Sequence, residues 1–277
     1  MSKPDSKVRK TIWVNSLIFN EDKYIWFAVK SVIDYVDKIL IWDSGSTDRT
    51  EEVVKILQKK YPQKIIFKKI GRQDAGGVTY ARQEMLKETK SDWLIILDGD
   101  EVWWKDSIKK VIFSINTRND LYAVVIPVIN LIGDIFHFQE EKAGRYQILG
   151  RKGHMNLRAI NLSTPGLKIK NDYPLEGFYD GEDKLLQEES EKLLFVDAPL
   201  LHFSSLKRSS KNETGASKKR KMRYEIGNRF PENFKYPEVL FERYPSIVPS
   251  PWQHMHITYR LRSLIETPIK KIKRRLT

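Results

Sequence analysis

Short apolar runs alternate with amphipathic segments through the first 105 residues of the chain. Each run is rich in Ile, Val, Leu or Trp and has the length of a strand buried in a parallel sheet. Between the runs, apolar residues recur at the spacing of one helix face, and the polar stretch 71–77 is expected to be a loop. This alternation predicts an α/β fold with a Rossmann-like, mostly parallel sheet flanked by helices. The predicted strands are 11–19, 38–42, 64–70 and 93–97, and the predicted helices are 22–35, 51–61 and 80–90.

The pattern changes in the second half of the chain. A helix face at 108–115 and a strand at 121–129 are followed, from about Gly133, by short β-like segments that Gly, Pro and charged residues interrupt. We expect these segments to complete the same domain with mixed or antiparallel strands, including a small antiparallel β extension. The expected organisation is one domain at 1–205, with halves at about 10–105 and 106–205, and a basic loop with a C-terminal helical extension at 206–277.

Composition and charge narrow the class of protein. Of the 277 residues, 40% are hydrophobic and 11% are aromatic, as in globular proteins rather than disordered ones. The 49 Lys and Arg residues exceed the 36 Asp and Glu residues and give a net charge of +13, so anionic partners are expected. Nucleic acid, an anionic membrane surface and phosphate-bearing substrates all meet this expectation.

The chain has no cysteine, which excludes disulfides and thiolate metal sites and fits a reducing compartment. Its polar N-terminal residues do not resemble a secretory signal. The longest apolar stretch, 121–133, contains Pro127 and Asn130 and is shorter than the ~20 residues of a membrane-spanning helix. We therefore expect a cytoplasmic protein, with peripheral membrane contact through the basic C-terminus left open.

Three acids directly follow the fourth predicted strand. The run WLIIL ends at Leu97, and Asp98, Asp100 and Glu101 come next. In open α/β sheets the ligand site lies beyond the carboxyl ends of the strands, and oxygen donors there favour a divalent cation such as Mg²⁺ or Mn²⁺. An acidic turn is the alternative, because Asp-Gly is a common turn dipeptide. An apolar strand that leads straight into the acids favours the metal site.

Four segments are expected to converge at this edge of the sheet, because the carboxyl ends of parallel strands lie together. Asp43 has the position of an acceptor for ribose hydroxyl or base N–H groups, and the Arg82 guanidinium can donate paired hydrogen bonds to a diphosphate. A turn cap at Asp43 and a solvated helix position for Arg82 are the alternatives. The converging segments are 20–21, 43–48, 74–82 and 98–101.

Two ordered motifs stand at 18–54 and 81–104, with IFNEDKY and LIWDSGSTDRT in the first and WLIILDGDEVWW in the second. Together they resemble the inverting family 2 glycosyltransferases of the GT-A fold, over roughly the first 105 residues. The resemblance implies a nucleoside-diphosphate sugar as donor, Mn²⁺ or Mg²⁺ as cofactor, and a glycan or lipid-linked acceptor, as in polysaccharide biosynthesis. It also implies that the two halves of the domain at 1–205 bind the nucleotide sugar and the acceptor, respectively.

Site residues follow from the resemblance, position by position. Asp98 would face the ribose of the nucleotide, and Asp100 would bind the metal. His202 resembles a His that often closes the metal site in this family, and a buried structural His is the alternative. The residues that would hold the nucleobase and ribose, or lie near them, are Asn20, Glu21, Asp43, Asp74 and Arg82.

An inverting transfer needs a general base for the acceptor hydroxyl, and a carboxylate in the second half of the domain is expected to fill this role. Glu176 is the first candidate, because a Glu after a short β segment resembles the base of this family. Asp183 is the second candidate and Asp180 the third. The competing interpretation is that these carboxylates are solvated, because the loop that contains them is rich in acids.

The sequence also has features of two other classes of protein. A sugar-phosphate nucleotidyltransferase would also use acidic metal ligands, but Asn20-Glu21-Asp22 stands where its Gly-rich phosphate loop would be. A basic module that binds membrane or nucleic acid is favoured by the net charge and by the basic segments 207–223 and 260–275. Few aromatic residues interleave with the first of these segments, so no specific nucleic acid is expected.

The C-terminal segment 257–276 places Ile and Leu at helical spacing among many Lys and Arg residues. We expect this helix to pack its apolar stripe on the domain. The alternative is that the helix lies on an anionic bilayer.

Overall fold

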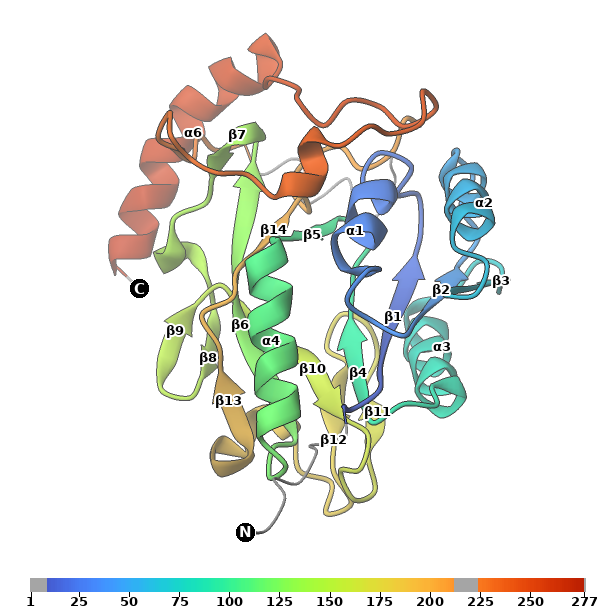
Figure 1. Ribbon diagram of the computed structural model, residues 1–277. Coiled ribbons are helices and arrows are strands. Elements are labelled where there is room, and N and C mark those ends of the chain that lie inside the picture. The colour runs from blue at the N-terminus through green and yellow to red at the C-terminus, as the bar shows by residue number, and fades with distance from the viewer. Residues whose placement is uncertain (1–8, 212–223, 277) are drawn as a thin grey trace, which may run out of the picture.

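The computed structural model describes residues 9–211 and 224–276 of the chain. The expected basic loop at 207–223 therefore lies largely outside the described residues, since it is described only as far as Lys211. Within the described ranges, one large sheet forms the centre of the molecule, and two small antiparallel sheets accompany it (Figure 1).

The first half of the sheet has the expected parallel arrangement. β1 (Ile12–Ile18) pairs in parallel with β2 (Lys38–Asp43) and with β4 (Trp93–Ile96), and β2 pairs in parallel with β3 (Ile65–Lys69). The order β4-β1-β2-β3 brings the carboxyl ends of these strands to one edge of the sheet. The α/β, Rossmann-like fold class expected from the sequence is confirmed.

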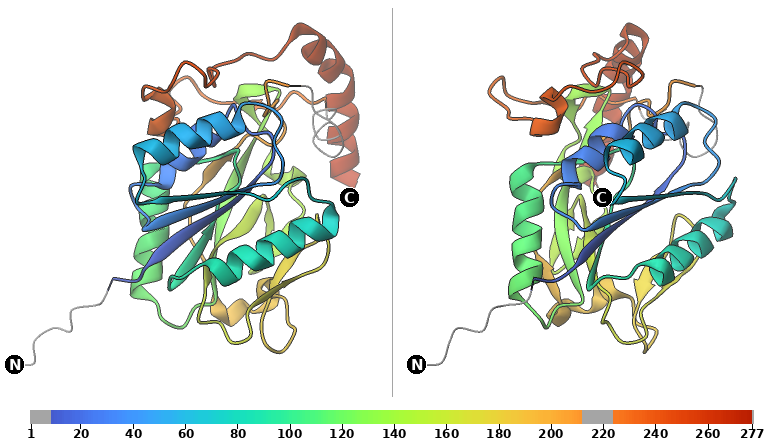
Figure 2. Two further views of the ribbon diagram at one scale, coloured as in Figure 1. Left: turned by 90° about the vertical axis from the view of Figure 1, so that its right-hand side faces the viewer. Right: turned by 45° about the vertical axis from the view of Figure 1, so that its right-hand side comes forward.

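Helices cover both faces of this parallel region (Figure 2). α1 (Ile25–Val32), α2 (Thr50–Lys60) and α4 (Lys105–Thr117) pack into the larger hydrophobic core. α3 (Ala75–Glu88) covers the opposite face, where its apolar residues meet those of β2. Burial of strand side chains on both faces explains why the strands read as continuous apolar runs.

α3 begins inside the stretch that the sequence pattern indicates as a loop. The Asp74 carboxylate accepts a hydrogen bond from the Gly77 amide at 2.7 Å and caps the helix, which starts at Ala75. Gly76 and Gly77 are poor helix formers, so periodicity alone does not reveal this first turn. The loop prediction for 71–77 is wrong from Ala75 onward.

The second half adds mixed strands to the same sheet, as expected. β10 (Met155–Asn161) lies antiparallel between β4 and β6 (Ala123–Ile132). β14 (Leu200–His202) pairs in parallel with β6 and antiparallel with β5 (Glu101–Trp103), so His202 stands opposite Glu101. The remaining strands are β7 (Asp134–Phe138), β8 (Tyr146–Ile148), β9 (Arg151–Gly153), β11 (Lys168–Lys170), β12 (Gly177–Tyr179), β13 (Leu193–Phe195) and β15 (Asn228–Arg229).

The C-terminal helix α6 (Ile257–Leu276) has the bounds expected from its periodicity. No helix in the described part of the chain is long and apolar enough to cross a bilayer. Short 3₁₀ turns complete the secondary structure at Glu141–Ala143, Leu186–Glu188, Ser190–Lys192 and Glu238–Phe241.

Candidate active site

The acids that follow β4 form a tight turn against the end of β1. A Cβ added at Gly99 would lie 2.7 Å from Glu21 Cγ and 3.2 Å from Ile18 Cγ2, so only glycine permits this close approach. Asp100 and Glu101 are fully buried, and β5 starts at Glu101. The turn therefore holds three carboxylates in a fixed position at the sheet edge.

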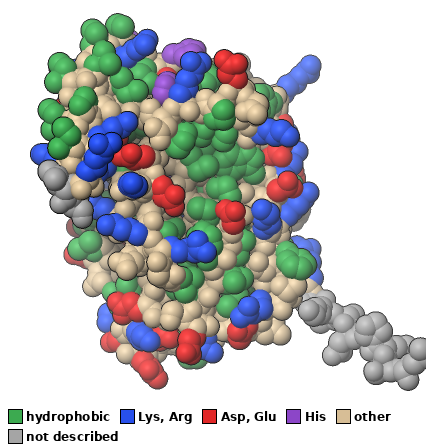
Figure 3. Space-filling model, turned by 90° about the vertical axis from the view of Figure 1, so that its left-hand side faces the viewer, with side chains coloured by type: hydrophobic (Ala, Val, Ile, Leu, Met, Phe, Trp, Pro, Cys, Tyr) green, Lys and Arg blue, Asp and Glu red, His purple; other side chains and the backbone are tan. Residues whose placement is uncertain are grey.

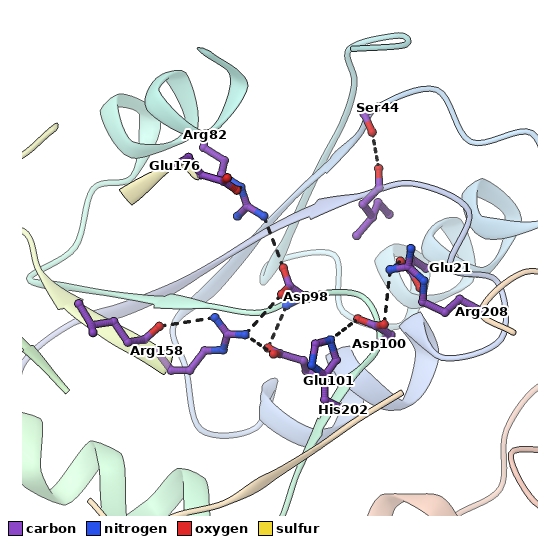
Figure 4. A network of polar contacts seen from close by, with 12 residues as sticks. Glu21, Ser44, Arg82, Asp98, Asp100, Glu101, Arg158, Glu176, His202 and Arg208 are labelled. Atoms are coloured by element: carbon purple, nitrogen blue, oxygen red, sulfur yellow. Dashed lines mark hydrogen bonds and ion pairs between the residues drawn. The ribbon is translucent and has the colours of Figure 1, made fainter. Parts of the chain in front are cut away.

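Two arginines compensate the negative charges of Asp98 and Glu101. Arg158, on β10, forms a buried ion pair with Glu101 and lies 3.4 Å from Asp98 Oδ2. Arg82, on α3, lies 3.5 Å from Asp98 Oδ1 (Figure 4). Burial alone would raise the pKa of Asp98, but Arg158 and Arg82 outweigh it and lower that pKa below its ordinary value. Burial also raises the pKa of Glu101, and there Arg158 offsets only part of the effect.

Asp100 is contacted from the other side by groups that lie far along the chain. His202 Nε2 lies 3.4 Å from Asp100 Oδ1, because the pairing of β14 with β5 carries His202 to the acidic turn. Arg208 donates to Glu21 Oε1 at 2.6 Å and lies 3.4 Å from Asp100 Oδ2. Burial would lower the pKa of His202, but Asp100 outweighs it and raises that pKa.

These side chains have the chemistry and spacing of a divalent cation site. Asp98, Glu101 and His202 each offer a ligand atom, and the three atoms lie within 4.8 Å of one another. Asp100 Oδ1 lies 3.4 Å from His202 Nε2, so a further carboxylate oxygen stands beside this group. The excess of negative charge that favours a proton on His202 would equally favour Mn²⁺ or Mg²⁺. The residues present therefore fit the metal that the resemblance implies.

The ends of β1 and β2 form the adjoining part of the edge, where nucleotide contacts are expected. Asn20 adopts a left-handed backbone conformation (φ 55°) and its side-chain oxygen accepts from the Thr47 amide at 2.8 Å. Asp43 Oδ1 accepts from the Ser46 amide at 2.8 Å. Asp43 Oδ2 is buried and has no hydrogen-bond partner among residues 9–211 and 224–276. A buried carboxylate oxygen of this kind calls for a ligand donor, which a ribose hydroxyl or base N–H would supply.

Glu176 reaches the site from the β11–β12 hairpin. The hairpin docks on α3, where the Thr79 hydroxyl donates to the Asn171 carbonyl at 2.7 Å and the Ile169 amide donates to Gln83 at 2.7 Å. Glu176 Oε1 consequently lies 3.4 Å from Arg82 Nε. Because Arg82 also contacts Asp98, the Glu176 and Asp98 carboxylates stand on either side of one guanidinium (Figure 4).

The other candidate acids have different surroundings. Asp183 has a side chain that is 57% exposed and pairs with Lys168 and Lys170 on β11. Asp180 accepts hydrogen bonds from backbone amides of its own turn, at Glu182 and Lys184. Asp74 caps α3, as described above. The contacts thus surround the acidic turn as a network, in which Arg82 joins Glu176 to Asp98, Arg158 joins Asp98 to Glu101, and Arg208 joins Glu21 to Asp100 beside His202.

Two arginines of this network were not among the residues expected from the sequence. Arg158 stands within the apolar strand segment HMNLRAI, and a buried arginine there requires a buried acid as partner, which is a usable signal. Arg208 belongs to a basic run whose charges look alike in sequence, so nothing singles it out. Its segment crosses the ends of β1 and β2, where Ser209 donates to Asp48 at 2.6 Å and the Ser210 amide donates to Asp22 at 2.8 Å.

Comparison with known proteins decides the family. The model of the family described as "Glycosyl transferase family 2" matches residues 17–166, which is just over half of the chain. The chain belongs to glycosyl transferase family 2. The matched region of this family 2 chain contains the acidic turn, Arg82 and Arg158, and it ends before Glu176 and His202.

Curated relatives of this family 2 chain include three proteins of low sequence identity. The uncharacterized glycosyltransferase MG025 of Mycoplasma genitalium is 26% identical over 192 residues, which cover 66% of this chain and 58% of that protein. The SPbeta prophage-derived glycosyltransferase SunS of Bacillus subtilis is 29% identical over 101 residues, or 36% of this chain and 22% of SunS. The minor teichoic acid biosynthesis protein GgaB of Bacillus subtilis is 27% identical over 47% of this chain and 14% of GgaB. The chain thus spans less than a quarter of the length of SunS and GgaB.

Solved structures with similarity to this chain have lower sequence identity. The mannosyltransferase PcManGT of Pyrobaculum calidifontis, in complex with GDP-Man and Mn²⁺, is 16% identical with a TM-score of 0.48, over 73% of this chain and 59% of that one. S. aureus TarS is 14% identical with a TM-score of 0.48, over 72% of this chain and 37% of TarS.

Proposed function

We propose that this family 2 chain is a metal-dependent inverting glycosyltransferase that moves a sugar from a nucleoside-diphosphate sugar to an acceptor hydroxyl. One observation carries the proposal: carboxylates from three separate parts of the chain meet at the carboxyl edge of the sheet, where Arg208 joins Glu21 to Asp100 and Arg82 joins Glu176 to Asp98. The reaction needs carboxylates that bind a metal and one carboxylate that acts as a base and takes a proton.

The donor nucleotide would occupy the ends of β1 and β2. The buried Oδ2 of Asp43 would accept from the ribose or the base, beside the loop that Asn20 holds. Arg82 would donate to the diphosphate, and its present partners, Asp98 and Glu176, show that its guanidinium is directed into the site. Backbone amides position Asn20 and Asp43, and the Asp98 and Glu176 carboxylates position Arg82.

Asp100 and His202 would hold Mn²⁺ or Mg²⁺, and Asp98 would face the ribose of the nucleotide. When bound, the cation would stabilise the negative charge that develops on the diphosphate as the bond from the anomeric carbon to oxygen breaks. The Arg158 pair keeps Glu101 and Asp98 in place and leaves Asp100 and His202 directed at the same locus. The role of Arg158 is therefore to position the acidic turn.

Glu176 would act as the general base. Its carboxylate would take the proton of the acceptor hydroxyl while the acceptor oxygen attacks the anomeric carbon from the face opposite the diphosphate. The bond to the acceptor oxygen forms, the bond to the diphosphate oxygen breaks with its electron pair, and the configuration at carbon inverts. Asp183 is the weaker candidate, because Lys168 and Lys170 pair with it and lower its pKa.

Replacement of Glu176 by Gln tests both the activity and the base. We expect the wild-type protein, supplied with Mn²⁺ and nucleoside-diphosphate sugars, to release nucleoside diphosphate in the presence of an acceptor, as measured by mass spectrometry. Glu176→Gln should lower the rate by about 10²- to 10⁴-fold with the donor Kd unchanged, because only proton removal is lost. Asp183→Asn is the matched control and should keep the wild-type rate. If Asp183→Asn lowers the rate strongly and Glu176→Gln does not, Asp183 is the general base instead of Glu176.

For the acceptor we propose only a chemical class, and we assign no particular sugar. A glycan or a lipid-linked acceptor is consistent with the open hairpin side of the site, where Lys168, Lys170 and Asp183 are partly exposed. Nucleotidyl transfer, the alternative reaction, would release pyrophosphate from a nucleoside triphosphate and a sugar phosphate. No described residue set favours that reaction over sugar transfer.

A further inference from the structure

The C-terminal helix α6 packs on the domain through its polar side. Ser263 and Thr267 are buried, and the Thr267 hydroxyl accepts from the Ile226 amide at 2.8 Å. Arg274 donates two hydrogen bonds of 2.6 Å to the Glu225 carboxylate and one of 2.9 Å to Glu140. The expectation that the apolar stripe of this helix packs on the domain is therefore wrong, because a buried acid anchors the basic side instead.

The apolar residues of α6 lie on the opposite side and face solvent. Successive helical residues are rotated by about 100°, so these side chains occupy an arc of about 140°, directed away from Ser263 and Thr267. In Figure 3, hydrophobic side chains line the upper left edge of the molecule, over α6. The exposed residues are Ile257 (59%), Leu261 (56%), Leu264 (56%), Ile265 (72%), Ile269 (52%) and Ile272 (58%).

Basic side chains border this apolar arc on both sides. At about 100° per residue, Arg262 and Lys273 flank one border, and Arg260 and Lys271 flank the other. Glu266 is the single acid of the helix, and Lys270 pairs with it at 2.9 Å. Up to Lys273, the outer surface of α6 is therefore apolar in the middle and positively charged at its margins, and Arg275 adds a positive charge to the arc in the last turn.

We propose that the outer side of α6 lies on an anionic lipid bilayer. An apolar stripe bordered by Lys and Arg is what a helix in the plane of a membrane presents, with the apolar residues among acyl chains and the charges at anionic headgroups. A partner protein surface would need to offer an apolar groove with acidic rims, whereas an anionic bilayer supplies both properties to a helix of ~30 Å length. Charge complementarity therefore selects the bilayer as occupant.

This inference goes beyond the proposed function, and it orients the enzyme. In the left view of Figure 2, α6 stands on the side of the molecule toward which β1 and β2 run. The carboxyl edge of the sheet, with its candidate site, would thus be held close to the bilayer. An acceptor anchored in that bilayer would be concentrated at the site without any added contact to the enzyme.

Co-sedimentation of the full chain with vesicles tests the proposal. We expect binding to vesicles of phosphatidylcholine with phosphatidylglycerol, and at least about tenfold weaker binding to phosphatidylcholine alone or in 1 M salt. The triple substitution Leu261→Ser, Ile265→Ser and Ile272→Ser should weaken binding at least about tenfold, as apolar burial is lost. Phe113→Ser on α4 removes an equally exposed apolar side chain (70%) outside α6 and should leave binding unchanged.

The same preparations distinguish the competing occupants. Circular dichroism should show wild-type melting for every variant, since the replaced side chains are exposed. Equal vesicle binding by the triple variant and the wild type would overturn the proposal. A second result would also overturn it. If light scattering shows a wild-type dimer that the triple variant lacks, and neither protein binds vesicles, a second copy of the chain covers α6. Nucleoside diphosphate release with a soluble acceptor is measured separately, and its loss would bear on the proposed function alone.

Discussion

Replacement of Asp100 by Asn is expected to abolish metal-dependent release of nucleoside diphosphate while the protein remains folded. The Asp100 side chain is 1% exposed and stands between His202 and Arg208, each at 3.4 Å. Asparagine keeps the shape of the side chain but removes the charge that would bind the cation. Because such a cation supplies several kcal/mol of transition-state stabilisation, the rate should fall by about 10³-fold or more.

The control for this prediction is Asp106→Asn, which makes the same chemical change at an exposed position in the first turn of α4. That variant should keep both the wild-type rate and the wild-type dependence on Mn²⁺. Full activity of Asp100→Asn, measured with the melting temperature of both variants, would refute a metal role for Asp100.

Arg158→Met is expected to lower the free energy of unfolding by about 3–5 kcal/mol, because it leaves the Glu101 carboxylate buried without its partner. The side chains of this pair are 8% and 0% exposed, so water cannot replace the lost guanidinium. Methionine fills much of the same volume, and the loss therefore reports the uncompensated charge rather than a cavity. Urea unfolding, followed by circular dichroism, measures the change.

A second substitution separates charge from packing. Adding Glu101→Gln to Arg158→Met should restore most of the lost stability, since no buried charge then remains. Arg9→Met breaks an ion pair with Asp37 whose arginine is 66% exposed, and this control should cost less than about 1 kcal/mol. An Arg158→Met protein that unfolds at the wild-type urea concentration would show that the pair is dispensable for the fold.

The sequence pattern predicted the parallel half of the sheet because that half follows local rules. Each strand there is a short apolar run and each helix has one apolar face, so the order of elements implies the fold. β5 escaped prediction, since a strand of three residues after the acidic turn has too little pattern of its own. The start of α3 escaped for another reason, as a side-chain cap at Asp74 outweighs two glycines.

Some residues of the candidate site can likewise be predicted from local sequence, and others cannot. The acidic turn is visible in sequence because its carboxylates are neighbours, and its position after an apolar strand indicates their location. Arg158 meets Glu101 from 57 residues away and Arg208 meets Asp100 from 108 residues away, and no local pattern encodes such pairs. Their positions depend on the antiparallel insertion of β10 and on the path of the chain after β14.

α6 shows the limit of periodicity most clearly. The apolar stripe and the helix bounds follow from the spacing of Ile and Leu, but the spacing does not say which side faces the domain. That choice is made by Glu225 and Glu140, which lie elsewhere in the chain and bind Arg274. An anchoring acid outside the helix thus reversed the orientation that hydrophobicity alone predicts.

We propose above all that the carboxyl edge of β1, β2 and β4 binds a nucleoside diphosphate together with a divalent cation. Thermal unfolding with UDP, GDP and other nucleoside diphosphates, each with and without Mn²⁺, tests it most directly. A ligand at a hundred times its Kd adds about 2.7 kcal/mol, so one diphosphate with Mn²⁺ should raise the melting temperature by several degrees, roughly 5–10 °C. The same ligands should leave Asp100→Asn unchanged. Equal melting temperatures with every nucleotide, in the presence and absence of Mn²⁺, would contradict the account.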